Sequence, residues 1–279
     1  MEKMKKRALL FGINGYRKLP ELHYAQNDAL GVANALKTHY QFSENEVVVL
    51  ASDRDEPDSK EDILERLEWS ESLDLLIVGF WGHGVWRGKK RYLCPRGTRL
   101  ERIEDTALTL EDLRDAVQRI PAKNICIILD CCQSQVDARM AEVPTLEVGA
   151  RNIVMEIFDP KKSDRVEEVQ EQTVAILNSC SEGELAYEWD EKSHGFFTHH
   201  LIEALQRGET EVTKIFSYVR EETKKSADLK QKKQVPFYEC LGGAEIILPA
   251  ADIILPAIQT KTFYVPENPN NVKITTHEI

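Results

Sequence analysis

The sequence has no apolar run long enough to cross a membrane as a helix. Such a helix needs about 20 consecutive apolar residues, and the first hydrophobic segment, residues 8–13, is interrupted by Asn14 and Gly15. The interruption comes before the core of a secretory signal peptide could form behind the basic start, residues 1–7. We therefore expect a cytoplasmic protein without membrane association.

Positive charge is in deficit. The chain has 36 Lys and Arg against 47 Asp and Glu, which gives a formal net charge of -11. Nucleic acids and anionic membranes require basic surfaces, so we expect neither as a partner, and the charge instead favours cationic ligands. With 42% hydrophobic and 30% charged residues, the composition is otherwise that of a globular domain.

Motifs for metals, disulfides and nucleotides are missing. The six cysteines contain no CxxC pair, and in a chain without an export signal we expect reduced thiols. Cys131 and Cys132 are adjacent, and adjacent side chains of a strand point to opposite faces, which disfavours binding of one metal by both. His199 and His200 fall in a predicted helix, where packing or solvent exposure is the simpler interpretation unless an acidic or cysteine partner stands at a fitting spacing. The glycines form neither a GxGxxG motif nor a P-loop, and we expect no cofactor and no metal.

Apolar runs and amphipathic segments alternate along the chain. Residues 7–13 form a nearly continuous apolar run, as in strands of a sheet that is covered on both faces. Residues 24–40 repeat apolar side chains every three or four positions, which predicts a helix. Further strands are expected at 46–51, 73–81, 123–130, 173–179 and 245–248, and further helices at 59–69, 109–120, 195–207 and 214–226. This order predicts an α/β fold with a mostly parallel sheet flanked by helices on both faces.

Two of the predicted helices begin with a capping pair. Ser59 precedes Asp62, and Thr109 precedes Asp112, at the three-residue spacing of a capping box. Both helices are therefore expected to start directly after the Ser or Thr.

The length predicts one domain with a tail, because single cores rarely grow beyond roughly 250 residues. Residues 133–172 are polar and lack periodicity, and loops of this length inside a domain are usually functional or disordered. We interpret them as a regulatory or processing loop within a domain of residues 1–248. Residues 249–279 include Pro256, Pro266 and Pro269 and are predicted to be an extended arm or linker.

Reactive side chains fall near the ends of two predicted strands. His83 lies in FWGHGVW and Cys132 in ILDCCQSQ. Ligands of parallel α/β sheets bind beyond the carboxyl ends of the strands, so we expect both residues at one rim, where a histidine could activate a thiol and later protonate a leaving amine. The glycines beside His83 suit a tight turn and leave N–H groups for an oxyanion. The alternative is that each residue is only a buried part of the core.

Between about residues 7 and 248, these sequences resemble the caspase, metacaspase and paracaspase peptidases. The opening strand and helix of the family are similar to ALLFGINGY and AQNDALGVANAL, its catalytic histidine turn to GHG, and the end of its nucleophile strand to DCC. A later segment of bacterial members resembles NSCSEGELAYE followed by HGFFTHHLIEAL. Caspases place the histidine about 50 residues before the cysteine, and here the interval is 49. The resemblance implies a caspase-like (caspase-hemoglobinase) fold.

The resemblance also implies roles for five residues. Cys132 would be the nucleophile and His83 the acid and base. The backbone N–H groups of Gly84 and Cys132 would form the oxyanion hole. Asp28 and Asp130 match the carboxylates with which metacaspase-like enzymes hold a basic side chain. Without the resemblance, Asp28 is a first-turn carboxylate favoured by the helix dipole, and Asp130 is a turn former at a strand end.

One departure from the family pattern follows the predicted nucleophile. Metacaspase-like members commonly continue with His-Ser-Gly and caspases with a basic residue and Gly, whereas this chain has Gln133, Ser134 and Gln135. The main hypothesis is an endopeptidase that cleaves proteins or peptides after Arg or Lys, activated by a protein partner or by autoprocessing, in bacterial defence or programmed death. The alternatives are a catalytically silent scaffold or switch and an acyl hydrolase or transferase with the same Cys and His.

Overall fold

The computed structural model describes residues 3–87, 90–133, 172–181, 184–242 and 244–250, with only the backbone described for Cys132 and Gln133. The predicted processing loop, apart from its first and last residues, and almost all of the predicted arm lie outside these ranges. Among the described residues, no helix combines the length and apolarity that a membrane crossing requires.

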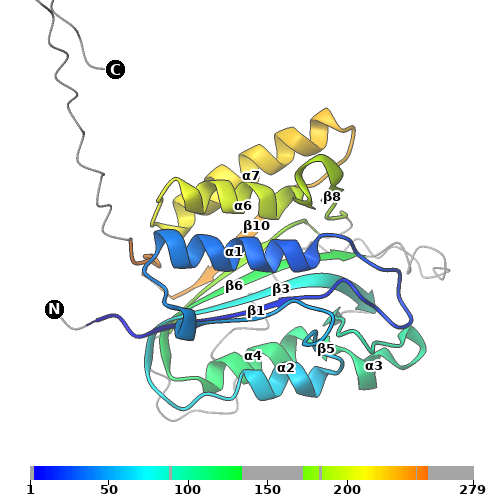
Figure 1. Ribbon diagram of the computed structural model, residues 1–279, viewed down its shortest axis with the longest axis horizontal. Coiled ribbons are helices and arrows are strands. Elements are labelled where there is room, and N and C mark those ends of the chain that lie inside the picture. The colour runs from blue at the N-terminus through cyan, green and yellow to red at the C-terminus, as the bar shows by residue number, and fades with distance from the viewer. Residues whose placement is uncertain (1–2, 88–89, 134–171, 182–183, 243, 251–279) are drawn as a thin grey trace, which may run out of the picture.

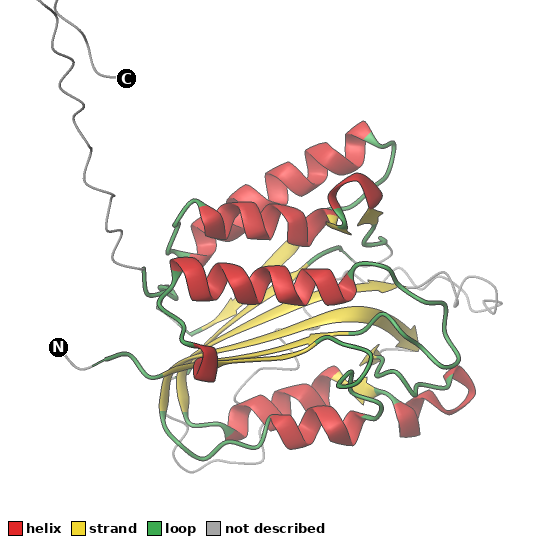
Figure 2. Ribbon diagram, in the orientation of Figure 1, coloured by secondary structure: helices red, strands yellow, loops and turns green. Residues whose placement is uncertain are grey.

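A central sheet lies between two layers of helices (Figures 1 and 2). The strands of this sheet are β1 (Lys6–Gly12), β2 (Val47–Leu50), β3 (Leu73–Arg87), β4 (Lys90–Leu93), β5 (Leu108–Thr109), β6 (Ala122–Gln133), β7 (Thr173–Asn178) and β10 (Phe237–Leu241). The helices are α1 (Ala25–His39), α2 (Lys60–Arg66), α3 (Ile103–Thr106), α4 (Leu110–Arg119), α6 (Phe196–Gln206) and α7 (Val212–Leu229). Two short strands, β8 (Glu188–Trp189) and β9 (His194–Gly195), pair with each other before α6.

The strand order is β10-β7-β6-β3-β1-β2. Strands β1, β2, β3, β6 and β7 are parallel, and β10 joins one edge antiparallel to β7. Helices α1, α6 and α7 cover one face, while α2 and α4 cover the other (Figure 1). The prediction of a mostly parallel sheet with helices on both faces is confirmed.

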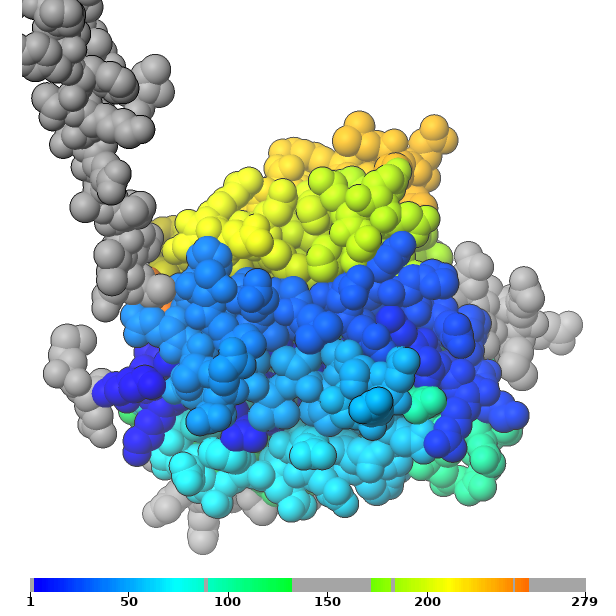
Figure 3. Space-filling model, viewed as in Figure 1, coloured from blue at the N-terminus to red at the C-terminus, as the bar shows by residue number. Residues whose placement is uncertain are grey.

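Both faces of the central strands are buried, each in its own hydrophobic cluster. In β1, Leu9 and Phe11 pack toward α2 and α4, whereas Ala8 and Leu10 pack toward α1, α6 and α7. This two-sided burial is why β1 is a continuous apolar run in the sequence. On the surface, side chains of α1 meet those of α6 along a continuous seam (Figure 3).

The two predicted capping pairs are confirmed. The Ser59 side chain accepts a hydrogen bond from the Asp62 N–H, and Asp62 in turn accepts from the Ser59 N–H. Thr109 and Asp112 make the same reciprocal pair at the start of α4. These bonds satisfy backbone donors that a helix start leaves unpaired.

The expectation of a tight turn at His83 is wrong. Strand β3 continues through His83 to Arg87 because, besides β1 and β6, it pairs with β4, from Gly84 with Leu93 to Arg87 with Lys90. Periodicity within 73–81 could not reveal a strand extension that depends on pairing with another segment.

The last predicted strand is also wrong. Residues 245–248 form only an isolated bridge between Ile247 and Glu211, and their apolar side chains Ile246 and Leu248 pack into the cluster beneath α6 and α7. The edge strand is instead Phe237–Leu241, whose residues are all half-buried. An edge strand that is only partly covered lacks the apolar run by which the central strands were found.

Candidate active site

The register of β3 and β6 brings the two predicted catalytic residues together. Cys132 is the direct partner of His83 across these parallel strands, and Asp130 is the partner of Trp81. Gly84 lies next along β3, opposite Gln133 of β6 and Leu93 of β4. The prediction that His83 and Cys132 lie at one rim of the sheet is confirmed for the backbone.

His83 is held in one tautomer. Its Nε2 lies 2.8 Å from the carbonyl oxygen of Pro20, and since a carbonyl only accepts hydrogen bonds, Nε2 must carry the proton. Nδ1 is then a lone pair, and it is buried without a hydrogen-bond partner among the described residues. Burial, the largest influence, lowers the pKa of His83. The ring is therefore neutral near pH 7 with one basic nitrogen available.

Tyr16 supports the same histidine from the loop after β1. Its hydroxyl oxygen accepts a hydrogen bond of 2.7 Å from the His83 N–H, and the two ring centroids are 4.6 Å apart. A Cβ at residue 82 would lie 2.5 Å from this hydroxyl oxygen. Gly82 is therefore required by the close approach of Tyr16 and not by a turn.

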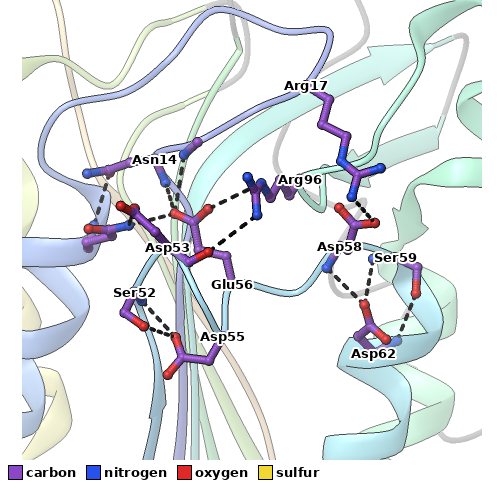
Figure 4. Close-up of polar contacts among 12 residues, drawn as sticks. Asn14, Arg17, Ser52, Asp53, Asp55, Glu56, Asp58, Ser59, Asp62 and Arg96 are labelled. Atoms are coloured by element: carbon purple, nitrogen blue, oxygen red, sulfur yellow. Dashed lines mark hydrogen bonds and ion pairs between the residues drawn. The ribbon is translucent and has the colours of Figure 1, made fainter.

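A buried carboxylate fixes the loop that carries Tyr16 and Pro20 (Figure 4). Glu56 Oε1 accepts hydrogen bonds from the backbone N–H groups of Asn14 and Gly15, at 2.7 and 3.2 Å, and from Gln26 Nε2 at 2.8 Å. Only 1% of the Glu56 side chain is exposed, and its Oε2 lies 4.0 Å from Arg96 Nε. The segment between β2 and α2 thus holds the loop against the site.

The two predicted substrate-binding carboxylates converge on Gly195. Asp28 accepts hydrogen bonds from the Gly195 N–H at 3.1 and 3.2 Å and pairs with His194 Nδ1 at 2.7 Å. A Cβ at Gly195 would lie 3.2 Å from an oxygen of Asp28 and 3.2 Å from an oxygen of Asp130. The structure therefore brings Asp28 and Asp130 together, with a residue lacking a side chain between them.

Both carboxyl groups are harder to ionise than usual. Burial, opposed by His194 and helped by the charge of Asp130, raises the pKa of Asp28 to about 7. Burial also raises the pKa of Asp130. Thr198 donates a 2.6 Å hydrogen bond to Asp130 and accepts one of 2.7 Å from Trp81 Nε1, so a buried chain of hydrogen bonds orients Asp130.

Glu188 adds a third acid to this rim. Its Oε1 accepts hydrogen bonds from the backbone N–H groups of His23 and Tyr24, at 2.7 and 2.9 Å, just before α1. Its charge contributes to the raised pKa of Asp130 and opposes the lowering of that of His83. Rim carboxylates therefore come from α1, β6 and β8.

The side chain of Cys131 is buried against Arg91. Its Sγ lies 3.0 Å from Nη2 of Arg91, and Nη1 of the same side chain donates a 2.7 Å hydrogen bond to Asn178 Oδ1. Cys131 is 1% exposed, and burial, opposed by Arg91, raises the pKa of its thiol. A buried protonated thiol is a weak nucleophile.

Several residues of this site were not singled out from the sequence. They are Tyr16, Pro20, Glu56, Glu188, His194 and Thr198. Tyr16, Glu188, His194 and Thr198 do fall in the segments that resemble the family, and this was the available signal.

Comparison with known proteins shows the same family over nearly the whole chain. The sequence profile described as the caspase domain matches residues 5–243. The chain is 31% identical to Metacaspase-1 of Eremothecium gossypii over 86 residues, which are 28% of this chain and 19% of that protein. It is 32% identical to Metacaspase-1A of Neurospora crassa over 87 residues, which are 29% of this chain and 19% of that protein. The matched part thus spans about a fifth of these relatives.

Solved structures show a shared fold. Caspase-1 from Spodoptera frugiperda superposes with a TM-score of 0.54 at 18% identity, covering 85% of this chain and 88% of that one. A protein from Geobacter sulfurreducens superposes with a TM-score of 0.56 at 14% identity, covering 86% and 94%. The Drosophila initiator caspase Dronc gives a TM-score of 0.52 at 12% identity, covering 88% and 85%.

Proposed function

Because this chain belongs to the caspase-domain family of cysteine peptidases, we propose that it is an endopeptidase with Cys132 as nucleophile and His83 as acid and base. One observation carries the proposal. Cys132 is the register partner of His83, whose Nδ1 is a buried lone pair without a partner among the described residues.

The proposed reaction begins with proton transfer from the Cys132 thiol to His83 Nδ1. The thiolate then attacks the peptide carbonyl, and the N–H groups of Gly84 and Cys132 stabilise the oxyanion. His83 protonates the leaving amine, and in the second half it takes a proton from the water that hydrolyses the thioester. The Pro20 carbonyl favours this cycle, since its hydrogen bond with Nε2 strengthens when the ring becomes positive.

The environment of Cys131 supports the choice of Cys132. Cys131 is buried beside Arg91 in the cluster that faces α2 and α4. His83 is the register partner of Cys132, whereas Cys131 lies opposite Gly82. The buried thiol of Cys131 already has a partner, which leaves Cys132 for the reaction.

We further propose cleavage after Arg or Lys. Asp28 and Asp130 are two carboxylates in a poorly hydrated position, where mutual repulsion disfavours full ionisation. A substrate guanidinium would relieve that cost and could donate two parallel hydrogen bonds to a carboxylate. Arg should therefore be preferred over Lys, and both over Asp.

Activation and location extend the same proposal. The enzyme would act on proteins in the cytoplasm, after cleavage within residues 133–172 or after binding an activating protein. The basic residues of that segment, Arg139, Arg151, Lys161, Lys162 and Arg165, are the class of residue that the proposed pocket accepts.

A panel of fluorogenic peptide amides that differ only in the residue before the scissile bond tests the function. Wild type should cleave the Arg peptide fastest, and Cys132→Ala should not cleave at all. The matching esters are tested beside the amides. A wild type inactive on both would favour the silent scaffold, and hydrolysis of the esters without the amides would favour the acyl hydrolase.

A further inference from the structure

A compact set of potential metal ligands lies on α6, beside the proposed specificity site. His199 and His200 are consecutive. Glu203 comes four positions after His199 and three after His200, so its side chain reaches both histidines. His200 Nδ1 is 2.7 Å from one Glu203 oxygen, and His199 Nε2 is 3.8 Å from the other. One ligand atom from each residue lies within 4.8 Å of the other two.

These distances are close to those that a metal would impose. Zinc bonds of about 2.0–2.2 Å in tetrahedral geometry separate neighbouring ligand atoms by roughly 3.3–3.5 Å. The 2.7 and 3.8 Å separations lie on either side of that range. The two separations involve different Glu203 oxygens, and one ligand atom from each residue lies within 4.8 Å of the others, so side-chain rotation would bring the three groups onto one ion.

The surrounding residues hold the ligands in place. His200 Nε2 is 2.8 Å from the Ser226 hydroxyl, and the Tyr218 hydroxyl donates a 3.1 Å hydrogen bond to Glu203. Such outer partners orient metal ligands. The Trp189 ring packs against both imidazoles, with centroids 5.2 and 6.0 Å away.

We propose that His199, His200 and Glu203 bind one divalent transition-metal ion such as Zn²⁺, with a further position open to water or another ligand. Two imidazoles and one carboxylate suit zinc, whereas calcium and magnesium prefer oxygen ligands only. From the sequence, metal binding by His199 and His200 required an acidic or cysteine partner at a fitting spacing. Glu203 is that acidic partner.

The metal site lies close to the pocket proposed around Asp28 and Asp130. A regulatory role for the metal therefore rests on the proposed function. The His199 ring stacks on His194 with centroids 6.4 Å apart, and His194 contacts Asp28. Thr198, the residue before His199, donates to Asp130. A bound dication would repel the positive side chain of a substrate, so the metal should inhibit cleavage after Arg.

Binding is tested with Co²⁺ on the Cys132→Ala background, which removes one thiol and any self-cleavage. Visible d–d absorption should appear at about one ion per chain without a thiolate charge-transfer band, and Zn²⁺ should abolish it. His199→Gln and Glu203→Gln, both at partly exposed side chains, should each weaken binding at least tenfold. His39→Gln, on α1, is the matched histidine control and should bind like the parent. Parent-like spectra in both α6 variants, or a thiolate band, would overturn the site.

Inhibition is a separate measurement on the active enzyme. Zn²⁺ should inhibit Arg-peptide cleavage by wild type and by His39→Gln at concentrations at least tenfold lower than for His199→Gln. Equal inhibition of all three would overturn the regulatory role. If wild type had no peptidase activity, the proposed function would fail, and the Co²⁺ spectra would still decide the metal site.

Discussion

At the scale of single residues, burial determines the chemistry of Asp28. Only 4% of the residue is exposed, and burial raises its pKa to about 7 although His194 and the Gly195 N–H favour the charged form. The folded-state pKa lies above the value near 4 expected when unfolded. The protonated Asp28 therefore contributes stability that is fully present below about pH 4. That contribution is lost as the pH rises through about 7. A bound cation would offset this loss.

The first prediction concerns a small guanidinium inhibitor such as agmatine. In wild type, inhibition of Arg-peptide cleavage should strengthen about tenfold between pH 6 and 8, because Asp28 ionises in that window. In Asp28→Asn the pH dependence should flatten, although His194, Asp130 and Glu188 still face the site. Asp105→Asn, an exposed acid on α3, is the control. A steep dependence that persists in Asp28→Asn would contradict this role.

The second prediction concerns Thr198, which joins Trp81 to Asp130. Thr198→Val keeps the shape but leaves the buried Trp81 Nε1–H without its acceptor, at a cost of about 1–3 kcal/mol, and removes the hydroxyl that donates to Asp130. Urea unfolding should show the loss of stability, and kcat/KM for Arg peptides should fall about tenfold as Asp130 loses its orientation. Thr198→Ser retains the hydroxyl and should restore both quantities. Equal activity of the Val and Ser variants would show that the hydroxyl does not position Asp130.

Single-residue contacts were the least predictable part of the site. His83 was found by its place at a predicted strand end, and Asp28 and Asp130 by resemblance to family motifs, but His194 pairs with Asp28 across 166 positions of the chain. Apolar periodicity predicts that residues 195–207 form a helix. It does not reveal that Thr198 of that helix meets Asp130, or that His194 just before it meets Asp28, because both contacts depend on packing between distant segments.

At the scale of elements, the loop between β1 and α1 decides how His83 is held. Its Pro20 carbonyl fixes the tautomer, its Tyr16 hydroxyl binds the His83 N–H, and Glu56 anchors its start. Glu56 acts on the site only through this loop and is a positioning residue. Its effect should therefore appear in turnover more than in substrate binding.

The third prediction follows from that anchor. Glu56→Ala should lower kcat about tenfold with little change in KM, and should reduce the free energy of unfolding by about 1–3 kcal/mol because two backbone donors lose their acceptor. Glu56→Gln keeps an acceptor and should recover much of the turnover. Asp55→Asn, in the same acidic segment but bonded only locally to Ser52, is the control. A rise in KM at constant kcat would place Glu56 in substrate binding instead.

Element boundaries were predictable where local signals set them. Capping pairs located the starts of α2 and α4, and burial on both faces made β1 a recognisable apolar run. The extension of β3 beyond residue 81 and the edge strand β10 depend on pairing with other strands. Neither leaves a periodic pattern in its own segment, so the sequence interpretation misplaced both.

At the scale of the whole molecule, the sheet order places the reactive residues at one rim. β6 and β3 are neighbours in the centre of the sheet, and α1 and α6 cover the face from which Asp28 and Thr198 approach. Strand and helix alternation predicted this architecture, and the caspase-like fold is confirmed by the solved structures that superpose on the chain.

The fourth prediction concerns processing of the whole chain. Purified wild type should yield fragments that end at a basic residue within 133–172, since the proposed pocket accepts Arg and Lys. Intact-mass measurement should find no such fragments in Cys132→Ala incubated in parallel. A wild type that cleaves peptides yet remains intact would contradict autoprocessing while leaving the catalytic proposal in place.

The most direct test of the central claim is covalent labelling of the nucleophile by an Arg-containing peptide chloromethyl ketone, located by mass spectrometry of the digested protein. The reagent should label Cys132 stoichiometrically and abolish peptidase activity, and His83→Ala should slow the labelling at least a hundredfold because the thiol loses its base. Cys131→Ala should be labelled like wild type. Labelling of Cys131 in an enzyme that survives Cys132→Ala, or labelling of Cys132 at the same rate without His83, would contradict the proposed Cys132 and His83 pair.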